Sequence, residues 1–521
     1  MTQPMYRRVT ILAALLITAL SILAFALGEH PGTGLESDSR LPDRGERPSG
    51  LKIDLQDRGT QFQTSSSKLA TITVHVPLVL RNWESIPHSE VVWGTQFGQD
   101  GWEPGYDELV EHDLPLVQAA GFTSIRTHLY WREVEPANAA PANYNWSKYD
   151  RRLRDFRGFG LEPVVGIVAY PRWATRYYCG GGLRPGMEVE WREFVRALAQ
   201  RYSAPPYDVH IWEIGNEVDG ETEVDPEEDS QRRPEQGGNQ PTWHFGGCWG
   251  DMVPEYVSFL RAAYEEIKAI DPTATVTLGG LAYAVFEKWF IRDFFDNFLA
   301  AGGADYTDVV GFHWFPYRQP WPTADEKAQE LRDIMAAHGV SKPLWLTETY
   351  MWDREGETDT RDLRVTFITQ DLVRAMGSRA VERIYWFGVR DFNPAISTFD
   401  RGLITPDHEP KPGLKVFEIM ADFVAGYPRP PAVAIPSQIE AYRFVQPRQN
   451  QETWAMWSIT GEVEAFILPI SGSSTEAVTI QVGDTYTTTN AISNIVPVEN
   501  GQITLSIDHE TLFLRVEKAN P

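Results

Sequence analysis

The sequence predicts an α/β protein, a (β/α)₈ TIM barrel followed by a small C-terminal antiparallel β domain. Between about residues 91 and 427, eight short apolar runs alternate with amphipathic stretches of helical length, a pattern typical of parallel βαβ units. Eight such units match a (β/α)₈ barrel with enlarged loops. After the proline-rich segment 427–431 no long helical pattern remains. Short alternating runs separated by turn residues there predict an antiparallel, sandwich-like domain.

The eight apolar runs are expected to form the barrel strands, in chain order 91–96, 124–128, 162–169, 210–214, 275–278, 308–313, 343–347 and 383–387. Helices are expected at 106–120, 187–202, 254–270, 286–301, 324–338, 361–376 and 414–424. The main rival is a doubly wound open sheet. It is disfavoured because such sheets usually have fewer strands and because the sequence contains no glycine-rich dinucleotide or phosphate loop.

The N-terminal segment predicts export. Arg7 and Arg8 precede an apolar run over 9–27, and the residues 24–26 resemble a small-residue cleavage site. Residues 1–28 are therefore expected to be a signal peptide, and the length of the run leaves an uncleaved membrane anchor open. The expected location is secreted or extracytoplasmic, and the only membrane contact foreseen is a tether through this segment.

The rest of the chain divides into three predicted parts. Residues 29–80 are expected to form a linker with a short extended segment, because they are rich in Gly, Pro, Ser and charged residues without a hydrophobic period. Residues 81–430 are expected to form the barrel, and residues 431–521 the β-sandwich-like domain.

The charge balance restricts the class of partner. The 521 residues contain 47 Lys and Arg against 72 Asp and Glu, and the formal net charge of −25 argues against nucleic acid and anionic membrane surfaces. A neutral polysaccharide or oligosaccharide fits this charge. The 18 Trp residues offer indole faces that can stack on sugar rings, although Trp also fills large cores and the count alone decides nothing.

Two glutamates stand at the predicted C-terminal ends of strands, where (β/α)₈ enzymes place their chemistry. In the fourth run, strand alternation puts Glu213 and Glu217 on one face, with Glu213 deeper as a structural carboxylate that needs a buried partner. In the seventh run, Leu344, Leu346 and Glu348 are expected to share a face. One terminal Glu is often a solvated rim residue, but two at strands four and seven predict a catalytic pair.

The segments around these residues resemble the motifs of glycoside hydrolase clan A, nearest to families 5 and 39. Residues 212–217 end in Asn216-Glu217, like the pair that ends strand four in that clan, and 346–349 resembles the strand-seven motif. The separation, 348 − 217 = 131 residues, suits three intervening βα units. The resemblance covers about residues 88–427. It implies a retaining O-glycosyl hydrolase that needs no cofactor and no metal, with Glu217 as acid/base and Glu348 as nucleophile.

Other positions carry the same resemblance. Arg126 is similar to the strand-two arginine that supports the nucleophile, and Asn216 is expected to hydrogen-bond the 2-hydroxyl of the sugar. Trp173 lies in a segment that resembles the loop after strand three. Trp386 matches the strand-eight tryptophan that floors the sugar subsite, with core packing as the alternative.

The sixth strand departs from the pattern of the clan. His313 is expected to orient the nucleophile or to contact substrate, with a satisfied core histidine as the alternative. The clan pairs this His with an aromatic hydroxyl two residues later, where this chain has Phe315. Tyr317 is the candidate that supplies the hydroxyl from a shifted position.

Two carboxylates suit this chemistry because cleavage needs a proton for the leaving oxygen and stabilisation of an oxocarbenium-like centre. In the retaining route Glu348 has to be ionised, helped by Arg126, while Glu217 is protonated at first. Two rivals use the same fold. A catalytically silent carbohydrate-binding barrel would be free to lose one of these residues, and a transglycosylase would keep them but transfer to an acceptor other than water.

The two cysteines of the chain, Cys179 and Cys248, are expected to form a disulfide. They follow strands three and four, whose loops emerge side by side at one end of a barrel, and an exported chain meets an oxidising compartment. Two unrelated buried thiols are the alternative. The acidic run 225–229 in the loop after strand four is better explained as a solvated loop than as a calcium site, so no metal is expected.

Overall fold

The computed structural model of the chain describes residues 90–96, 106–177, 181–221, 247–282, 290–316, 322–351, 364–391, 401–431, 433–470, 476–482 and 492–517. All of them belong to one compact unit, residues 77–521. Within these residues, no helix has both the length and the apolar character needed to cross a membrane. The predicted signal peptide or anchor (1–28) and linker (29–80) lie outside the described residues.

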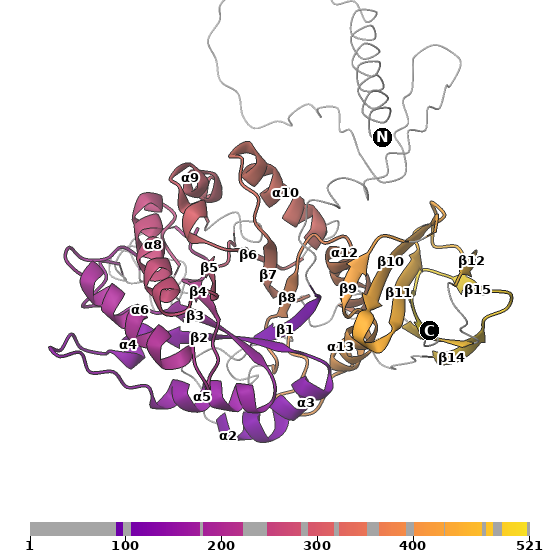
Figure 1. Ribbon diagram of the computed structural model, residues 1–521, viewed down its shortest axis with the longest axis horizontal. Helices are drawn as coiled ribbons and strands as arrows, with labels where there is room; N and C mark the ends of the chain where they lie inside the picture. Colours follow the sequence, from indigo (N-terminus) through magenta and orange to yellow (C-terminus); the bar gives the residue numbers. More distant parts are fainter. Residues whose placement is uncertain are drawn as a thin grey trace, which may run out of the picture. The chain divides into compact units, whose positions relative to one another are not determined.

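Eight parallel strands form the predicted barrel (Figure 1). Neighbours in the chain pair from β1 to β5 and from β6 to β8, and β1 also pairs with β8. Parallel bridges from Thr277 to Val309 and from Leu281 to Phe312 join β5 to β6 and close the barrel. The strands are β1 (Val92–Gln96), β2 (Ser124–Tyr130), β3 (Glu162–Val168), β4 (Ile211–Ile214), β5 (Thr275–Leu278), β6 (Val310–Trp314), β7 (Leu344–Thr349) and β8 (Arg383–Trp386).

Helices follow the strands and surround the barrel (Figure 1). They are α2 (Tyr106–Glu108), η2 (Leu109–Asp113), α3 (Leu114–Ala119), α4 (Trp131–Val134), α5 (Ser147–Gly158), α6 (Glu188–Tyr202), α8 (Val253–Ile270), α9 (Phe294–Ala300), η4 (Gly303–Tyr306), α10 (Ala324–Ala337), η5 (Phe367–Asp371), α12 (Leu372–Gly377) and α13 (Pro412–Phe423). α5 lies outside the expected helical ranges because it is mostly charged, and its buried face rests mainly on Tyr149, Leu153 and Phe156. α10 begins with a capping box between Thr323 and Glu326.

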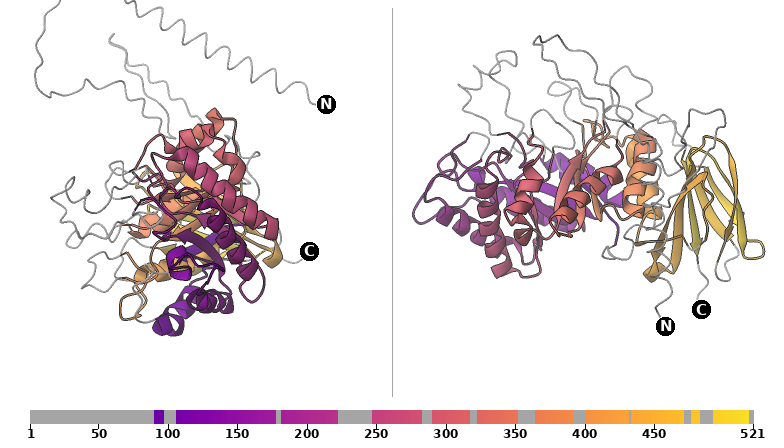
Figure 2. Two further views of the ribbon diagram at one scale, coloured as in Figure 1. Left: turned by 90° about the vertical axis from the view of Figure 1, so that its left-hand side faces the viewer. Right: turned by 90° about the horizontal axis from the view of Figure 1, so that it is seen from above.

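The C-terminal residues form two antiparallel sheets, as predicted (Figure 2). The larger has the order β14-β13-β16-β11-β10-β9, and the smaller pairs β12 with β15. The strands are β9 (Tyr427–Arg429), β10 (Ile439–Gln446), β11 (Gln451–Ser458), β12 (Glu464–Pro469), β13 (Glu476–Val482), β14 (Ile492–Pro497), β15 (Gln502–Ile507) and β16 (Thr511–Glu517). Trp454 and Met456 of the larger sheet share a buried cluster with Phe466 and Leu468 of the smaller one, so the two sheets pack face to face.

Strand alternation gives the larger sheet a second apolar face. Ala455 and Trp457 of β11 point away from the sandwich and join the core of the barrel. The Thr453 hydroxyl donates to the backbone carbonyl of Phe423 at the end of α13. Because β9 already belongs to this sheet, the β structure begins before residue 431, the predicted boundary.

Candidate active site

The inner face of the barrel is identified by one layer of buried side chains. Val164, Ile211, Val309, Trp345 and Tyr385 form a cluster of their own, separate from the core that joins strands to helices. Alternation then turns every second residue of each strand toward the barrel interior. On β4 the next inward residue is Glu213, as predicted.

Glu217 lies three residues beyond the end of β4, in a turn rather than in the strand. Its φ of 50° is in the left-handed region, and Gly215 before it has a φ of 91°. Residues other than glycine rarely adopt such a φ. Outliers of this kind are typical of functional sites, where the backbone conformation sets the direction of a functional side chain. The Glu217 side chain remains 13% exposed.

Glu348 reaches the interior through a β-bulge. The register between β6 and β7 shifts so that Phe312 pairs with Leu346 and His313 with Glu348, which leaves Thr347 as the extra residue. Leu344 and Leu346 belong to the core between strands and helices. The expectation that they share a face with Glu348 is therefore wrong, because the bulge reverses the alternation just before the carboxylate.

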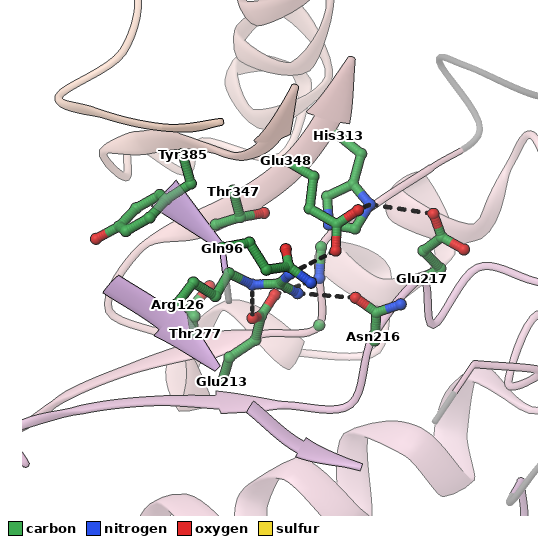
Figure 3. A network of polar contacts seen from close by, with 12 residues as sticks. Gln96, Arg126, Glu213, Asn216, Glu217, Thr277, His313, Thr347, Glu348 and Tyr385 are labelled. Atoms are coloured by element: carbon green, nitrogen blue, oxygen red, sulfur yellow. Dashed lines mark hydrogen bonds and ion pairs between the residues drawn. The ribbon is translucent and has the colours of Figure 1, made fainter. Parts of the chain in front are cut away.

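Arg126 on β2 is the centre of the polar network (Figure 3). Its side chain is fully buried, and its Nε donates to Glu213 Oε2 over 2.6 Å while Nη1 lies 2.5 Å from Glu348 Oε1. Nη1 also donates to Gln96 Oε1 over 2.5 Å, and Nη2 donates to Asn216 Oδ1 over 2.8 Å. The other oxygen of Glu213, Oε1, accepts a hydrogen bond from the backbone amide of Gly280 over 2.9 Å. The predicted structural role of Glu213 and the predicted contact of Arg126 with Glu348 are both present.

His313 on β6 stands between the two predicted catalytic carboxylates. Its Nδ1 lies 3.1 Å from Glu217 Oε1 and 3.6 Å from Glu348 Oε2 (Figure 3). Burial lowers the pKa of His313 from 6.5 to about 4, so the ring is neutral at ordinary pH. Gly280 allows this position, because a Cβ there would overlap the imidazole.

His313, Glu217 and Glu348 form a compact cluster, which limits the distance between the two carboxylates. One ring nitrogen of His313 and one oxygen each of Glu217 and Glu348 all lie within 4.8 Å of one another. Such a trio of donors could hold a metal ion. Arg126 disfavours a cation there, because its guanidinium already contacts Glu348 and would repel it.

Trp386 and Trp173, which were predicted to contact the sugar, have no described contact with Glu217 or Glu348. Trp386 is fully buried, its Nε1 donates to the carbonyl of Arg401 over 2.9 Å, and its ring packs edge-on against Phe417 of α13. Because Tyr385 faces inward, its neighbour Trp386 faces the helices, and the structure supports core packing for it. Trp173 is partly exposed, packs against Trp131, and is not in contact with the two carboxylates in any described interaction.

Some predicted residues fall outside the described residues. Tyr317 is one of them, so its predicted hydroxyl stays a prediction. Cys179 is another. Cys248 is fully buried and disulfide-bonded, as the predicted bridge requires.

Sequence reasoning missed an aromatic group beside Glu348. Phe387, the residue after Trp386, lies with its ring centroid 6.1 Å from that of Phe315 and 5.9 Å from that of Tyr350. The Arg401 guanidinium carbon lies 4.6 Å from the Phe387 centroid. Strand parity could have found Phe387, because Tyr385 is the inward neighbour two residues earlier. Arg401 comes from a loop and carries no periodic signal.

Comparisons with known proteins give one matching family model and several solved structures with a similar fold. The profile of a family described as "Glycosyl hydrolase catalytic core" matches residues 252–411, which include β5 to β8 and Glu348. No curated protein sequence matches the chain.

Solved structures that share the fold include three glycosidases. A family 39 glycoside hydrolase from the gut symbiont Bacteroides cellulosilyticus WH2 is 18% identical, with a TM-score of 0.55 and coverage of 82% of this chain and 81% of that one. A glucosidase from Croceicoccus marinus is 15% identical, with a TM-score of 0.58 and coverage of 84% and 97%. A monomeric β-xylosidase from Caulobacter crescentus CB15 is 15% identical, with a TM-score of 0.53 and coverage of 82% and 96%.

Proposed function

We propose that this chain, a glycosidase with the clan A barrel fold, hydrolyses β-O-glycosidic bonds of a neutral polysaccharide or oligosaccharide with retention of the anomeric configuration. The observation that carries the proposal is the separation of the carboxylates, with one oxygen of Glu217 and one of Glu348 within 4.8 Å. Retaining enzymes hold their carboxyl groups about 5 to 5.5 Å apart, whereas inverting enzymes need about 6.5 to 9.5 Å to admit a water.

The described contacts of the two carboxylates support the proposed roles. Glu348 forms an ion pair with the buried guanidinium of Arg126, the kind of partner that a carboxylate nucleophile requires. Glu217 is not among the groups that Arg126 contacts in the described network; its nearest described polar neighbour is the neutral His313. In the proposed route Glu217 is the group that carries a proton at the start of the reaction.

In the first step, an oxygen of Glu348 bonds to the anomeric carbon while the bond to the leaving oxygen breaks and that oxygen takes the proton of Glu217. In the second step, Glu217 takes a proton from water. The water oxygen bonds to the anomeric carbon, and the ester bond to Glu348 breaks. Both groups return to their starting states, so no co-reactant other than water is needed.

Asn216 is oriented for the sugar rather than for the protein. A guanidinium only donates, so Asn216 must present Oδ1 to Arg126, which leaves the amide NH₂ to donate elsewhere. We assign this group to the 2-hydroxyl of the bound sugar, an interaction that strengthens in the transition state.

The test is the anomeric configuration of the first product. Aryl β-xylosides and aryl β-glucosides are the first substrates to try, since the similar structures include a β-xylosidase and a glucosidase. Proton NMR during early turnover should show the β-anomer before mutarotation. The α-anomer would contradict the retaining route, and no turnover of any aryl glycoside or neutral polysaccharide would contradict the proposed function. New glycosides formed with added acceptor sugar would identify a transglycosylase.

A further inference from the structure

The turn that carries Glu217 is joined to the residues after β5 by a buried carboxylate. Asp219, two residues after Glu217, is 1% exposed. Both of its carboxylate oxygens lie 3.0 Å from the backbone nitrogen of Ala282, which donates to them. A carboxylate is costly to bury unless donors hold it in this way. Asp219 is therefore a fixed attachment point, and its burial keeps it out of contact with a bound sugar.

The residues after β5 lie directly against this turn. A Cβ added at Gly279 would stand 2.6 Å from the backbone carbon of Gly215, so no side chain fits between the two segments at that point. The backbone amide of Ile291 donates to the carbonyl of Asp219 over 2.8 Å. Both the side chain and the backbone of Asp219 are therefore bonded to residues that follow β5.

The residues after β5 also position His313. The carbonyl of Leu281, next to Ala282, accepts the backbone amide of His313 over 2.8 Å. The imidazole of His313 then reaches Glu217, with Nδ1 3.1 Å from Oε1 (Figure 3). The contacts form a closed chain, because Asp219 bonds the turn to this segment and Leu281 bonds His313 to it. One short segment therefore sets the distance between the Glu217 carboxylate and His313 from both sides.

The conformation of the turn explains why it has to be held. The φ of Glu217 is 50°, and a residue other than glycine keeps such a φ only when the surrounding structure determines it. On the other side of the turn, the backbone amide of Trp249 donates to the carbonyl of Val218 over 3.1 Å. Asp219 contributes a side-chain bond, so a single substitution there can loosen the turn without changing Glu217 itself.

We propose that Asp219 is a positioning residue for the acid/base, which holds the left-handed turn against the residues after β5 and so sets where Glu217 delivers its proton. This inference rests on the proposed function, because it assigns a role relative to Glu217 as the acid. Proton transfer to the leaving oxygen needs hydrogen-bond reach, and a displacement of about 1 Å can lower a rate by about a hundred-fold. Loosening the turn therefore acts on the step in which Glu217 donates.

The test is the leaving-group dependence of kcat/KM in Asp219→Ala. This parameter reports the first step, in which poor leaving groups need the proton and activated phenols depart without it. The variant should lose about ten- to a hundred-fold on glycosides with poor leaving groups and less than about three-fold on activated aryl glycosides. A merely structural role would lower kcat/KM by the same factor across the series, because it only reduces the share of intact enzyme.

Two further variants make the assignment specific. Asp219→Asn keeps one acceptor for the amide of Ala282, so it should show the same selectivity with a smaller loss. Asp308→Ala is the matched control, because Oδ2 of Asp308 accepts the backbone amide of Val276 over 2.8 Å, near the start of β5. This control also removes a carboxylate that holds a β5 amide, and it should leave the leaving-group dependence unchanged.

The slope of the leaving-group series decides the outcome. A slope that steepens in Asp219→Ala, and less in Asp219→Asn, but not in Asp308→Ala supports the proposal. An unchanged slope in the Asp219 variants, or an equal change in Asp308→Ala, overturns it. If Asp219→Ala does not fold, the slope in Asp219→Asn decides alone. An inactive wild-type enzyme on all aryl glycosides would show that the proposed function has failed, whereas an active wild type with unchanged slopes in the Asp219 variants would refute only this inference.

Discussion

Two regions of the molecule are built on the same plan, an arginine that holds a glutamate. At the barrel mouth Arg126 contacts Glu213 and Glu348. Between the barrel and the β domain, Arg374 of α12 donates to both oxygens of Glu440 on β10, over 2.6 and 2.9 Å. In each region the carboxylates raise the pKa of the arginine, so both guanidinium groups remain charged.

The difference lies in how completely the glutamate is satisfied. Besides the two donors of Arg374, Glu440 accepts from the Tyr442 hydroxyl at 2.7 Å and from the Trp457 indole at 3.1 Å. The described contacts of Glu348 are Arg126 on one oxygen and His313, 3.6 Å from the other. A carboxylate surrounded by four donors is a structural anchor. One that is held on one side, next to a second carboxylate, can still react.

The largest effect that this comparison predicts is on the rate. Glu348→Gln should lower kcat by roughly 10⁵-fold, because a neutral amide cannot form the glycosyl ester. Glu440→Gln should leave kcat and KM within about two-fold of wild type. Steady-state kinetics on one aryl glycoside measures both variants. A Glu440 variant as inactive as the Glu348 variant would contradict the distinction between a structural anchor and a reactive carboxylate.

The second effect separates the acid from the nucleophile. Glu217→Ala should slow substrates with poor leaving groups by about 10²- to 10⁴-fold, since they need the proton most. Activated aryl glycosides, whose leaving groups depart without a proton, should be slowed far less in the first step. Rates across a series of phenols of different acidity measure this, and a uniform loss across the series would contradict the role of Glu217 as the acid.

At the domain junction the expected effect is on stability. Glu440→Gln removes the charge that neutralises Arg374 and should lower the free energy of unfolding by about 2 kcal/mol. Glu418→Gln is the matched control, because its ion pair with Lys415 is 48% exposed on both sides and contributes little. Urea denaturation compares the two, and equal losses would show that the junction network is no stronger than a surface pair.

His313 gives the barrel mouth a pH dependence of stability. Its folded pKa of about 4 lies below the unfolded value of 6.5, so the unfolded chain binds the proton more readily. The contribution, up to about 3 kcal/mol, is fully present above about pH 6.5 and is lost as the pH falls towards about 4. His313→Gln should flatten the pH dependence of the unfolding free energy in that window, and an unchanged slope would exclude this role.

The sequence was sufficient for the features that repeat with a period. Eight apolar runs predicted the eight strands because each strand is buried on both faces, and the inward position of Glu213 followed from alternation in a regular strand. Glu217 lies beyond the end of that strand, where the left-handed turn and not strand alternation sets its direction. Alternation failed at β7, where the bulge at Thr347 places Glu348 inward despite the outward Leu346. A bulge depends on the register of a neighbouring strand, and one strand's sequence does not record it.

Family resemblance failed in a different way at Trp386. The motif identified the correct strand end, but the side that a residue faces depends on the alternation of this strand, which Tyr385 sets. The position of Arg401 could not be predicted from the sequence for a third reason. It comes from a loop, and only the folded chain brings it beside Tyr350.

In the proposed mechanism Glu348 forms a covalent bond to the sugar. A 2-deoxy-2-fluoro glycoside with an activated leaving group slows both steps but allows the first, so the intermediate should accumulate. Intact mass spectrometry should then show one added fluorosugar, and peptide mapping should place it on the peptide that contains Glu348, with no adduct in Glu348→Gln. An adduct on another residue, or none from a reagent whose parent glycoside is turned over, would contradict the account.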